Sequence, residues 1–156
     1  MSATVGQPAP DFTLKSSEQK DVTLSEFKGK KNVLVLFFPL AFTSVCTEEL
    51  CSTRDSIAVY NSAEAEVLAV SVDSFFTLGQ FKSANNLNFT LLSDFNKEAA
   101  AAYGSLYDEF FGMKGVAKRS AFVVDKEGTV RYAEVLEDAG KQPNFAAIQE
   151  TLAQLN

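Results

Sequence analysis

The chain of 156 residues contains no histidine, no tryptophan and only two cysteines. The absence of histidine removes the side chain that usually acts as a neutral base near pH 7, and also the commonest metal ligand in proteins. A structural zinc site usually needs four nitrogen or sulfur ligands, and two cysteines cannot supply them. A metal site is therefore disfavoured, and the two cysteines require another explanation.

Positive charge and long hydrophobic runs are also scarce. The 14 Lys and Arg are outnumbered by 20 Asp and Glu, which gives a net charge of −6 and argues against nucleic acid and anionic membranes as partners. No segment approaches the roughly 18 apolar residues of a membrane-spanning helix. The first seven residues lack the charged start and apolar run of a signal peptide. We therefore expect a cytoplasmic protein, in which two close cysteines are more often catalytic than structural.

What is present suits one α/β domain over residues 1–156, because no repeat, low-complexity tract or linker divides the chain. The pattern of apolar runs and turn residues predicts hairpins over 11–24 and 121–133, strands over 33–38, 65–72 and 90–92, and helices over 46–61, 75–84, 97–103 and 145–155. A continuous apolar strand is usually buried on both faces. We therefore expect a mixed central sheet with helices on both faces and an N-terminal hairpin.

The cysteines lie where the strand over 33–38 gives way to a helix. Thr43 or Ser44 can cap that helix, and Cys46 stands in its first turn. The unpaired N–H groups of a helix N-terminus favour the thiolate, which is the reactive form of cysteine. Cys51 follows five residues later. This arrangement indicates thiol redox chemistry, although a single buried cysteine is more often a small hydrophobic residue.

Pro39, Thr43 and Cys46 form the pattern P-x-x-x-T-x-x-C, and Arg119 stands just ahead of a later strand. In this context the sequence resembles a peroxiredoxin. The resemblance covers nearly the whole chain and includes QPAPDF at 7–12, FFP at 37–39, Arg54-Asp55 and the final helix.

The resemblance implies a thioredoxin-like fold and the reduction of hydroperoxides at a peroxidatic cysteine. Cys46 matches that cysteine, and Thr43 matches the hydroxyl that contacts the thiolate and the bound peroxide. Pro39 matches the residue that shields the pocket, and Arg119 matches the arginine that completes it. Cys51 matches the resolving cysteine of the peroxiredoxin Q subfamily, which implies a disulfide within one subunit. The run PLAFTSVCTE at 39–48 also resembles the alkyl hydroperoxidase E subgroup, some members of which lack a resolving cysteine.

Physical chemistry supports these roles but leaves simpler readings open. An arginine stays cationic at working pH, so Arg119 can favour a thiolate and stabilise the charge that grows when a peroxide bond breaks. The simpler alternatives are a capping role for Thr43, a strand-ending role for Pro39, and an ion pair of Arg119 with Glu109 or Asp125. Glu49 and Arg54 are candidates for an outer layer around the site, but they lie about 140° apart on a regular helix, so we do not expect them to pair, and neither is assigned to the site.

The spacing of the cysteines sets a condition on their disulfide. Five residues along an ideal helix separate two Cα atoms by ~8.6 Å, whereas a disulfide needs Cα atoms within roughly 7 Å. If both cysteines are helical, the first turns must unwind before the bond can close. We therefore predict local unfolding of about residues 44–53 on oxidation.

The expected function is a thiol-dependent peroxidase for hydrogen peroxide and organic hydroperoxides, with a thioredoxin- or glutaredoxin-like reductant. No metal, flavin or nucleotide cofactor is implied, and the protein is expected to be a monomer or a homodimer. A one-cysteine peroxidase and a peroxide-sensing redox relay are the alternatives. A thiol–disulfide oxidoreductase is disfavoured because no C-x-x-C motif is present. The Phe pairs at 75–76 and 110–111 are most simply core residues, with an apolar substrate pocket or a dimer contact as alternatives.

Overall fold

The computed structural model describes residues 3–155. Its strands are β1 (Thr13–Ser16), β2 (Asp21–Thr23), β3 (Asn32–Phe37), β4 (Ala65–Ser71), β5 (Thr90–Ser93), β6 (Ser120–Val124) and β7 (Val130–Val135). Its helices are α1 (Ser44–Asp55), α2 (Ile57–Ser62), α3 (Phe75–Ala84), α4 (Glu98–Ala102), α5 (Phe145–Gln154) and the 3-10 turn η1 (Leu24–Phe27). Within the described residues, no helix is both long and apolar enough to cross a membrane.

The strands form one mixed sheet with the order β2-β1-β5-β4-β3-β6-β7. β3 runs parallel to β4, and β4 runs parallel to β5, while β6 lies antiparallel to β3 on its other side. All six residues of β3 are buried, as its continuous apolar sequence predicts. The predicted mixed sheet and its N-terminal hairpin are therefore confirmed.

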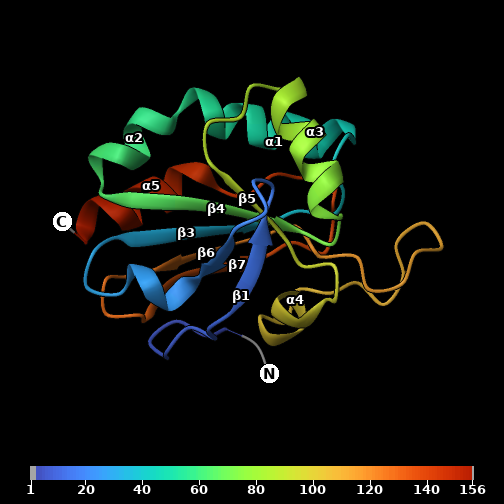
Figure 1. Cartoon of the computed structure of the whole chain (residues 1–156). Helices are drawn as coiled ribbons and strands as arrows, with labels where there is room; N and C mark the ends of the chain where they lie inside the picture. The colour runs from blue at the N-terminus through green and yellow to red at the C-terminus, as the bar shows by residue number, and fades with distance from the viewer. Residues whose placement is uncertain (1–2, 156) are drawn as a thin grey trace.

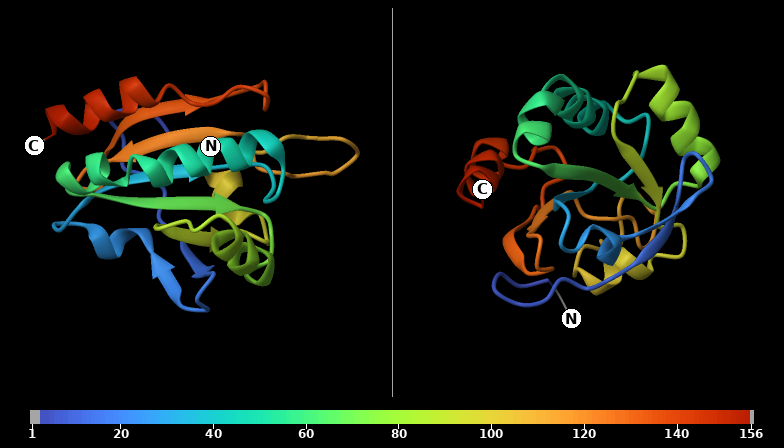
Figure 2. Two further views of the ribbon diagram at one scale, coloured as in Figure 1. Left: turned by 90° about the horizontal axis from the view of Figure 1, so that it is seen from above. Right: turned by 60° about the vertical axis from the view of Figure 1, so that its left-hand side comes forward.

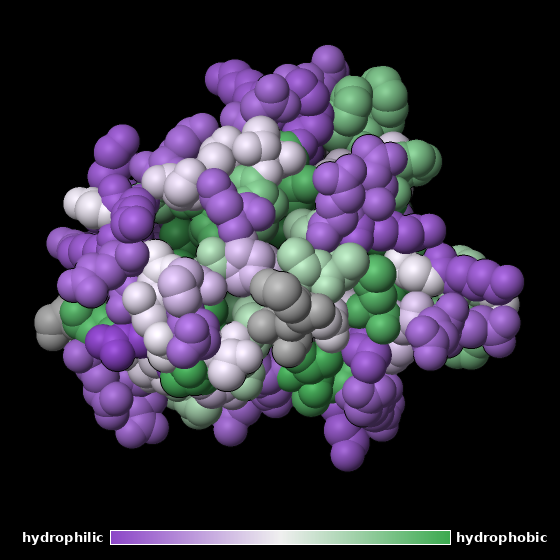
Figure 3. All heavy atoms as spheres, turned by 90° about the horizontal axis from the view of Figure 1, so that it is seen from below, coloured by the Kyte–Doolittle hydropathy of each residue, from purple (hydrophilic) through white to green (hydrophobic). Residues whose placement is uncertain are grey.

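Helices cover both faces of this sheet, as predicted. Alternate residues of β3 point to opposite sides, so each face of the sheet carries apolar side chains that the helices bury. Leu34 and Leu36 belong to a cluster with buried residues of α1, α2, α3 and α5. Val33, Val35 and Phe37 belong to a second cluster with residues of α4 and η1. Figure 1 shows α1, α2 and α3 above the sheet and α4 below it, and Figure 2 shows the same layers from two other directions. The view from below in Figure 3 is largely hydrophilic, with apolar side chains interspersed.

The structure shifts several predicted boundaries. The helix expected over residues 46–61 is two helices, because the backbone leaves the helical conformation at Ser56, with φ −103° and ψ 12°. Periodicity could not show this break, since a change at one residue leaves the apolar pattern on both sides intact. The first hairpin pairs Thr13 with Thr23, so its first strand begins two residues later than expected. The helix expected over 97–103 is shortened to α4.

The hairpin between β6 and β7 follows from its turn residues. The Asp125 carboxylate accepts hydrogen bonds from the N–H groups of Glu127 and Thr129, both at 2.9 Å. Gly128 has a φ of +86°, a conformation that residues with a side chain rarely adopt. This turn sets β7 against β6. On its other side β6 pairs with β3, and Arg119 lies directly before its first residue, Ser120.

Candidate active site

The sheet register brings two distant segments of the chain together at one end of β3. Phe37, the last residue of β3, pairs with Ser120, the first residue of β6. Arg119 therefore precedes β6 at the edge where the chain leaves β3 and enters α1. Cys46 lies in the first turn of α1. This is the carboxyl end of a parallel strand, where ligands usually bind in open α/β sheets, and where we expected Cys46.

Arg119 makes the central contacts of the site. Its Nη2 donates a hydrogen bond to Cys46 Sγ at 3.2 Å, and its Nη1 donates to Glu49 Oε1 at 2.6 Å. Its Nε donates to the carbonyl oxygen of Ala139 at 3.0 Å, which fixes the plane of the guanidinium. The guanidinium therefore brings a fixed positive charge and a hydrogen-bond donor to the sulfur, in a chain without histidine.

This cluster is almost completely removed from solvent, with exposures of 2% for Arg119, 1% for Cys46 and 0% for Glu49. Burial alone would lower the pKa of Arg119, but the charges of Glu49 and Cys46 raise it. Burial also raises the pKa of Glu49 to about 7, against the opposing effect of Arg119. Among the described residues, Glu49 Oε2 is a buried side-chain oxygen without a hydrogen-bond partner. Glu49 is therefore a titratable group within the site of a chain that has no histidine.

Glu49 is the functional residue that sequence reasoning missed. It does not pair with Arg54, as predicted, but it does hold Arg119. The alternative of an ion pair between Arg119 and Asp125 is wrong, because Asp125 binds Arg131 at 2.9 Å. The available signal was the spacing of Cys46 and Glu49, since residues three apart on a helix share one face. That signal could not be used without knowing that Arg119 lies opposite.

Thr43 occupies the N-cap position of α1, with φ −94° and ψ 154°, but its side chain makes no capping hydrogen bond. Its Oγ1 donates instead to the carbonyl oxygen of Leu40 at 2.8 Å. The predicted position is thus confirmed, whereas the predicted capping role is wrong. The exposed Thr43 hydroxyl stands one turn ahead of Cys46 and remains open to a ligand.

Asp73 fixes the loop between β3 and α1 by accepting a hydrogen bond from its backbone. Pro39 is buried directly after the strand. Two residues later, the N–H of Ala41 donates to Asp73 Oδ2 at 2.8 Å, and the same oxygen accepts from Ser71 Oγ at 2.6 Å. Phe42 adopts a φ of +68° and contacts Phe81 edge to face, with 5.1 Å between the ring centroids. These contacts fix the loop that carries Pro39 and Thr43.

Cys51 lies apart from this cluster. It is half-buried in the second half of α1, and its Sγ is 3.8 Å from Asn85 Oδ1. Both cysteines are free thiols, and both lie within α1. An ideal helix places their Cα atoms ~8.6 Å apart, beyond the roughly 7 Å that a disulfide allows. The condition set by the sequence, that both cysteines are helical, is met.

A shallow apolar hollow adjoins the Cys46 end of α1. Thr43 and Val45 line one side of it, and Phe110, Phe111 and Met113 line the other, around a volume of about 520 Å³. The last three come from the loop between α4 and β6, which projects from the molecule in Figure 1. The exposed fraction of Phe111 is 89%, so the interpretation of this residue as part of the core is wrong.

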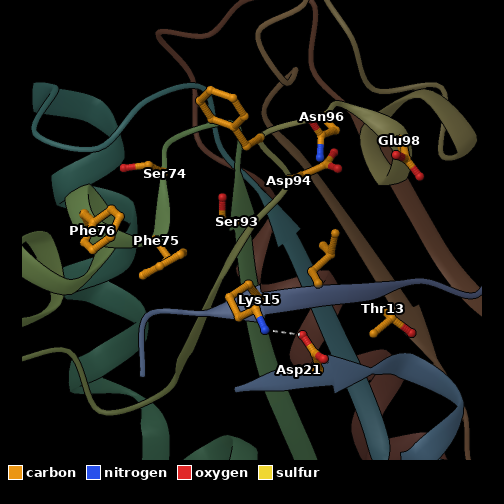
Figure 4. A pocket seen from close by; sticks show the side chains of 12 residues that line it. Thr13, Lys15, Asp21, Ser74, Phe75, Phe76, Ser93, Asp94, Asn96 and Glu98 are labelled. Atoms are coloured by element: carbon orange, nitrogen blue, oxygen red, sulfur yellow. Dashed lines mark ion pairs between the residues drawn. The ribbon is translucent and has the colours of Figure 1, made fainter. Parts of the chain in front are cut away.

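A second hollow, of about 430 Å³, lies between the N-terminal hairpin and the loops after β4 and β5. Figure 4 shows Phe75 and Phe76 on one side of it, Asp94 on another, and the ion pair of Lys15 with Asp21 across its floor. Phe76 is 69% exposed, so it too is not a core residue. None of the residues that line this hollow belongs to the Cys46 cluster.

Comparison with known proteins decides the family. Residues 5–133 match the model of the AhpC/TSA family. The chain belongs to this family of peroxiredoxins. Alkyl hydroperoxide reductase E of Mycobacterium tuberculosis is 41% identical to it over 139 residues, which make up 89% of this chain and 86% of that protein. The chloroplastic peroxiredoxin Q of Oryza sativa subsp. japonica is 39% identical over 127 residues, which make up 81% of this chain and 57% of that protein.

Solved peroxiredoxin structures agree with this assignment. The mitochondrial 2-Cys peroxiredoxin of Plasmodium falciparum superposes with a TM-score of 0.85 and 31% identity, covering 97% of this chain and 93% of that one. The predicted thioredoxin-like fold is therefore confirmed. As a peroxiredoxin, the protein is an oxidoreductase that reduces peroxides by thiol chemistry.

Proposed function

We propose that the protein reduces hydrogen peroxide and organic hydroperoxides at Cys46 and that Cys51 resolves the product within the same subunit. The observation that carries the first part is the hydrogen bond of 3.2 Å from Arg119 Nη2 to Cys46 Sγ, in a site that excludes water. Electrostatic interactions are stronger in such surroundings than in solvent. The positive charge of Arg119 therefore acts strongly on the sulfur of Cys46, where the reaction needs a thiolate.

The first step forms a sulfenic acid. The Cys46 thiolate attacks the terminal oxygen of the hydroperoxide, the S–O bond forms, and the O–O bond breaks with its electron pair on the leaving oxygen, which leaves as the alcohol or water after taking up a proton. Arg119 stabilises the negative charge that develops on that oxygen. The Thr43 hydroxyl binds the peroxide beside the sulfur, and the buried Pro39 shields the thiolate from bulk water.

The second step closes the disulfide. The Cys51 sulfur attacks the sulfenic sulfur of Cys46, the S–S bond forms, the S–O bond breaks, and the hydroxyl leaves with the thiol proton as water. An external dithiol protein of the thioredoxin or glutaredoxin type then reduces the disulfide to two thiols. We place this cycle in the cytoplasm, because both cysteines must return to thiols after every turnover. A monomer or a homodimer can complete it, since both cysteines lie on one helix.

A one-cysteine mechanism is the second candidate, and one observation favours it. Glu49 and Leu50, which lie between the two cysteines, are both 0% exposed, and Glu49 is paired with Arg119. Unwinding this segment removes both residues from the core, which costs free energy. Under this mechanism, an external thiol reduces the sulfenic acid directly. A redox relay would show the same oxidation but pass it to a partner protein.

The deciding experiment is the intact mass of the reduced protein after one equivalent of hydrogen peroxide, followed by blocking of the remaining thiols. A loss of about 2 Da with no thiol left to block supports the Cys46–Cys51 disulfide. A gain of about 16 Da with one blockable thiol supports the one-cysteine mechanism. The Cys51→Ser variant is the matched control, because it has no second thiol: it can gain about 16 Da but cannot lose 2 Da, and no thiol remains to be blocked once Cys46 is oxidised. Turnover with thioredoxin then separates a peroxidase from a relay, which oxidises but is not recycled.

A further inference from the structure

The second half of α1 is tied to the segment between α3 and β5. Arg54 Nη1 donates to the carbonyl oxygen of Asn85 at 2.6 Å, and Asn88 Nδ2 donates to the carbonyl oxygen of Arg54 at 3.4 Å. Asn85 is the C-cap residue of α3, and its Nδ2 donates to the carbonyl oxygen of Phe81 at 3.1 Å. We call Arg54, Asn85 and Asn88 the Arg54 clasp. It joins α1 to a helix end that is itself fixed in the core, because Phe81 is fully buried.

Cys51 sits against this clasp. Its Sγ lies 3.8 Å from Asn85 Oδ1, within the distance of a weak thiol hydrogen bond. Asn85 thus uses its backbone oxygen for Arg54, its side-chain nitrogen for Phe81 and its side-chain oxygen for Cys51. The position of the Cys51 thiol is therefore set by contacts outside α1, made by a residue from the end of another helix.

The first half of α1 is held in a different way. Its polar attachments to the sheet run through Arg119, which binds Cys46 and Glu49. Oxidation to a sulfenic acid removes the negative charge that attracts Arg119 to the sulfur, so it weakens one of these attachments. Nothing in the oxidation changes the bond from Arg54 to Asn85, which is charge-assisted and therefore among the stronger hydrogen bonds. Oxidation loosens the Cys46 end and leaves the Cys51 end as it was.

We propose that the Arg54 clasp positions Cys51 for resolution, so that Cys46 moves to a stationary Cys51 and the unwinding of α1 ends before Arg54. This inference rests on the proposed role of Cys51. An unwound chain spans at most about 3.6 Å per residue, so the segment from Cys46 to Cys51 can extend to roughly 18 Å. That reach is ample for Cys46 to approach while Cys51 stays in place. Because only one end moves, the effective concentration of the two sulfurs stays high.

The role of the clasp is tested by measuring how much of the Cys46 sulfenic acid becomes disulfide and how much becomes sulfinic acid. In the Arg54→Gln variant we expect the disulfide to form about three- to tenfold more slowly, as loss of one strong hydrogen bond would allow. The sulfenic acid then survives longer, and more of it becomes sulfinic acid at the same peroxide concentration. Rapid quenching with thiol blocking and intact mass spectrometry measures both products.

Two further variants sharpen this test. Arg54→Lys keeps a cationic donor and is expected to recover part of the rate. Asn85→Ala removes the acceptor for Cys51 and the side-chain hydrogen bond to Phe81 but keeps the backbone acceptor for Arg54, and is expected to have a smaller effect in the same direction.

Asp55→Asn is the matched control. The exposed Asp55 carboxylate pairs with Arg54 Nε at 3.0 Å, so this substitution leaves the bond from Arg54 to Asn85 in place. The ratio of disulfide to sulfinic acid should therefore not change. If Arg54→Gln closes the disulfide at the wild-type rate or faster, the clasp is only a packing contact and the proposal is overturned. A wild-type protein that stops at the sulfenic acid overturns the proposal together with the role of Cys51, and so identifies that different failure.

Hydrogen exchange of the wild-type protein tests where the unwinding of α1 ends, without any substitution. The reduced and the disulfide forms are compared by mass spectrometry of peptides. A helical amide is protected by the carbonyl four residues earlier, so we expect the amides of residues 47–50 to lose protection in the disulfide form, while those of residues 59–63, whose acceptors lie beyond Arg54, keep it. Loss of protection at residues 59–63 would contradict the proposal, and so would unchanged protection at residues 47–50.

Discussion

The two ends of α1 differ in almost every physical respect. At the first end, Cys46 is 1% exposed and receives a hydrogen bond from a buried guanidinium. At the second end, Cys51 is half-buried, and its sulfur faces the amide oxygen of Asn85 at 3.8 Å. One helix therefore holds one sulfur in a hydrogen bond with a buried cation, and the other against a neutral acceptor with the more exposed Arg54 nearby. A thiol becomes a strong nucleophile through its surroundings, and the difference indicates which sulfur reacts first with peroxide.

The largest test of this comparison exchanges each sulfur for oxygen. Cys46→Ser should abolish peroxide reduction, because a serine hydroxyl is not ionised by a nearby arginine at neutral pH. Cys51→Ser should leave the first oxidation at the wild-type rate and abolish only the disulfide. Rapid mixing with hydrogen peroxide, followed by quenching and quantification of the free thiols, measures both the first oxidation and the formation of the disulfide. If both variants lost the first oxidation by peroxide equally, the different surroundings of the two cysteines would not decide which sulfur reacts.

Arg119→Lys should lower the second-order rate with peroxide by about a hundredfold. The positive charge remains, but one ammonium cannot reproduce the fixed fork that holds both Cys46 and Glu49. The rate is measured under single-turnover conditions, so that the reductant does not limit it. Arg131→Lys is the matched control, since Arg131 pairs with Asp125 and its side chain is 50% exposed. A rate that changes equally in both variants would mean a general charge effect instead of a specific contact.

Glu49→Gln should change how stability depends on pH. Burial raises the pKa of Glu49 from its ordinary 4.5 to about 7 in the folded protein. Between these two values the folded state binds the proton more tightly than the unfolded state, so the stability from this proton is complete below pH 4.5 and is lost as the pH rises through 7. The wild-type free energy of unfolding should therefore fall, relative to Glu49→Gln, by up to about 3 kcal/mol over this window.

Urea denaturation of the two proteins at a series of pH values measures this difference, because all other titrating groups are common to both. Parallel curves would show that Glu49 keeps an ordinary pKa in the folded state. The variant should also react with peroxide more slowly, since its neutral amide holds Arg119 less firmly than a carboxylate does. A matched Glu48→Gln variant, which changes an exposed neighbour, should show neither effect.

The smallest expected effect concerns the hollow beside the Cys46 end. Phe111→Ser should raise the KM for a bulky aromatic hydroperoxide about two- to fivefold, because an apolar contact of that size is lost. The rate with hydrogen peroxide, which is too small to reach Phe111, should not change. Phe76→Ser in the second hollow serves as the control. An equal change with both peroxides would mean that Phe111 supports the loop and not the substrate.

The local patterns in the sequence predicted most of the architecture. Alternation and apolar runs located the strands and the hairpin at Asp125–Gly128, because side-chain periodicity and turn chemistry depend on near neighbours. The pattern of Pro39, Thr43 and Cys46, through its resemblance to peroxiredoxins, predicted which end of α1 is reactive. The break at Ser56 was not predictable in this way, since it involves one residue and leaves the pattern on either side unchanged.

The partner of Arg119 shows where sequence reasoning ended. Glu49 and Arg119 are separated by 70 positions, and several acids were available to that arginine on sequence grounds. Only the pairing of β3 with β6 places Arg119 opposite the first half of α1. The Arg54 clasp has the same origin, because the end of α3 meets α1 only after both helices pack on one face of the sheet.

By itself, the sequence determined the kind of chemistry. Two cysteines five positions apart after a buried strand, in a chain without histidine, leave thiol redox chemistry as the simplest reading. The tertiary structure alone decided which groups act on each sulfur. Hydrogen bonds and ion pairs between distant residues depend on positions in space, and these are set by strand register and helix packing. The surroundings that make Cys46 and Cys51 different are therefore a product of the fold.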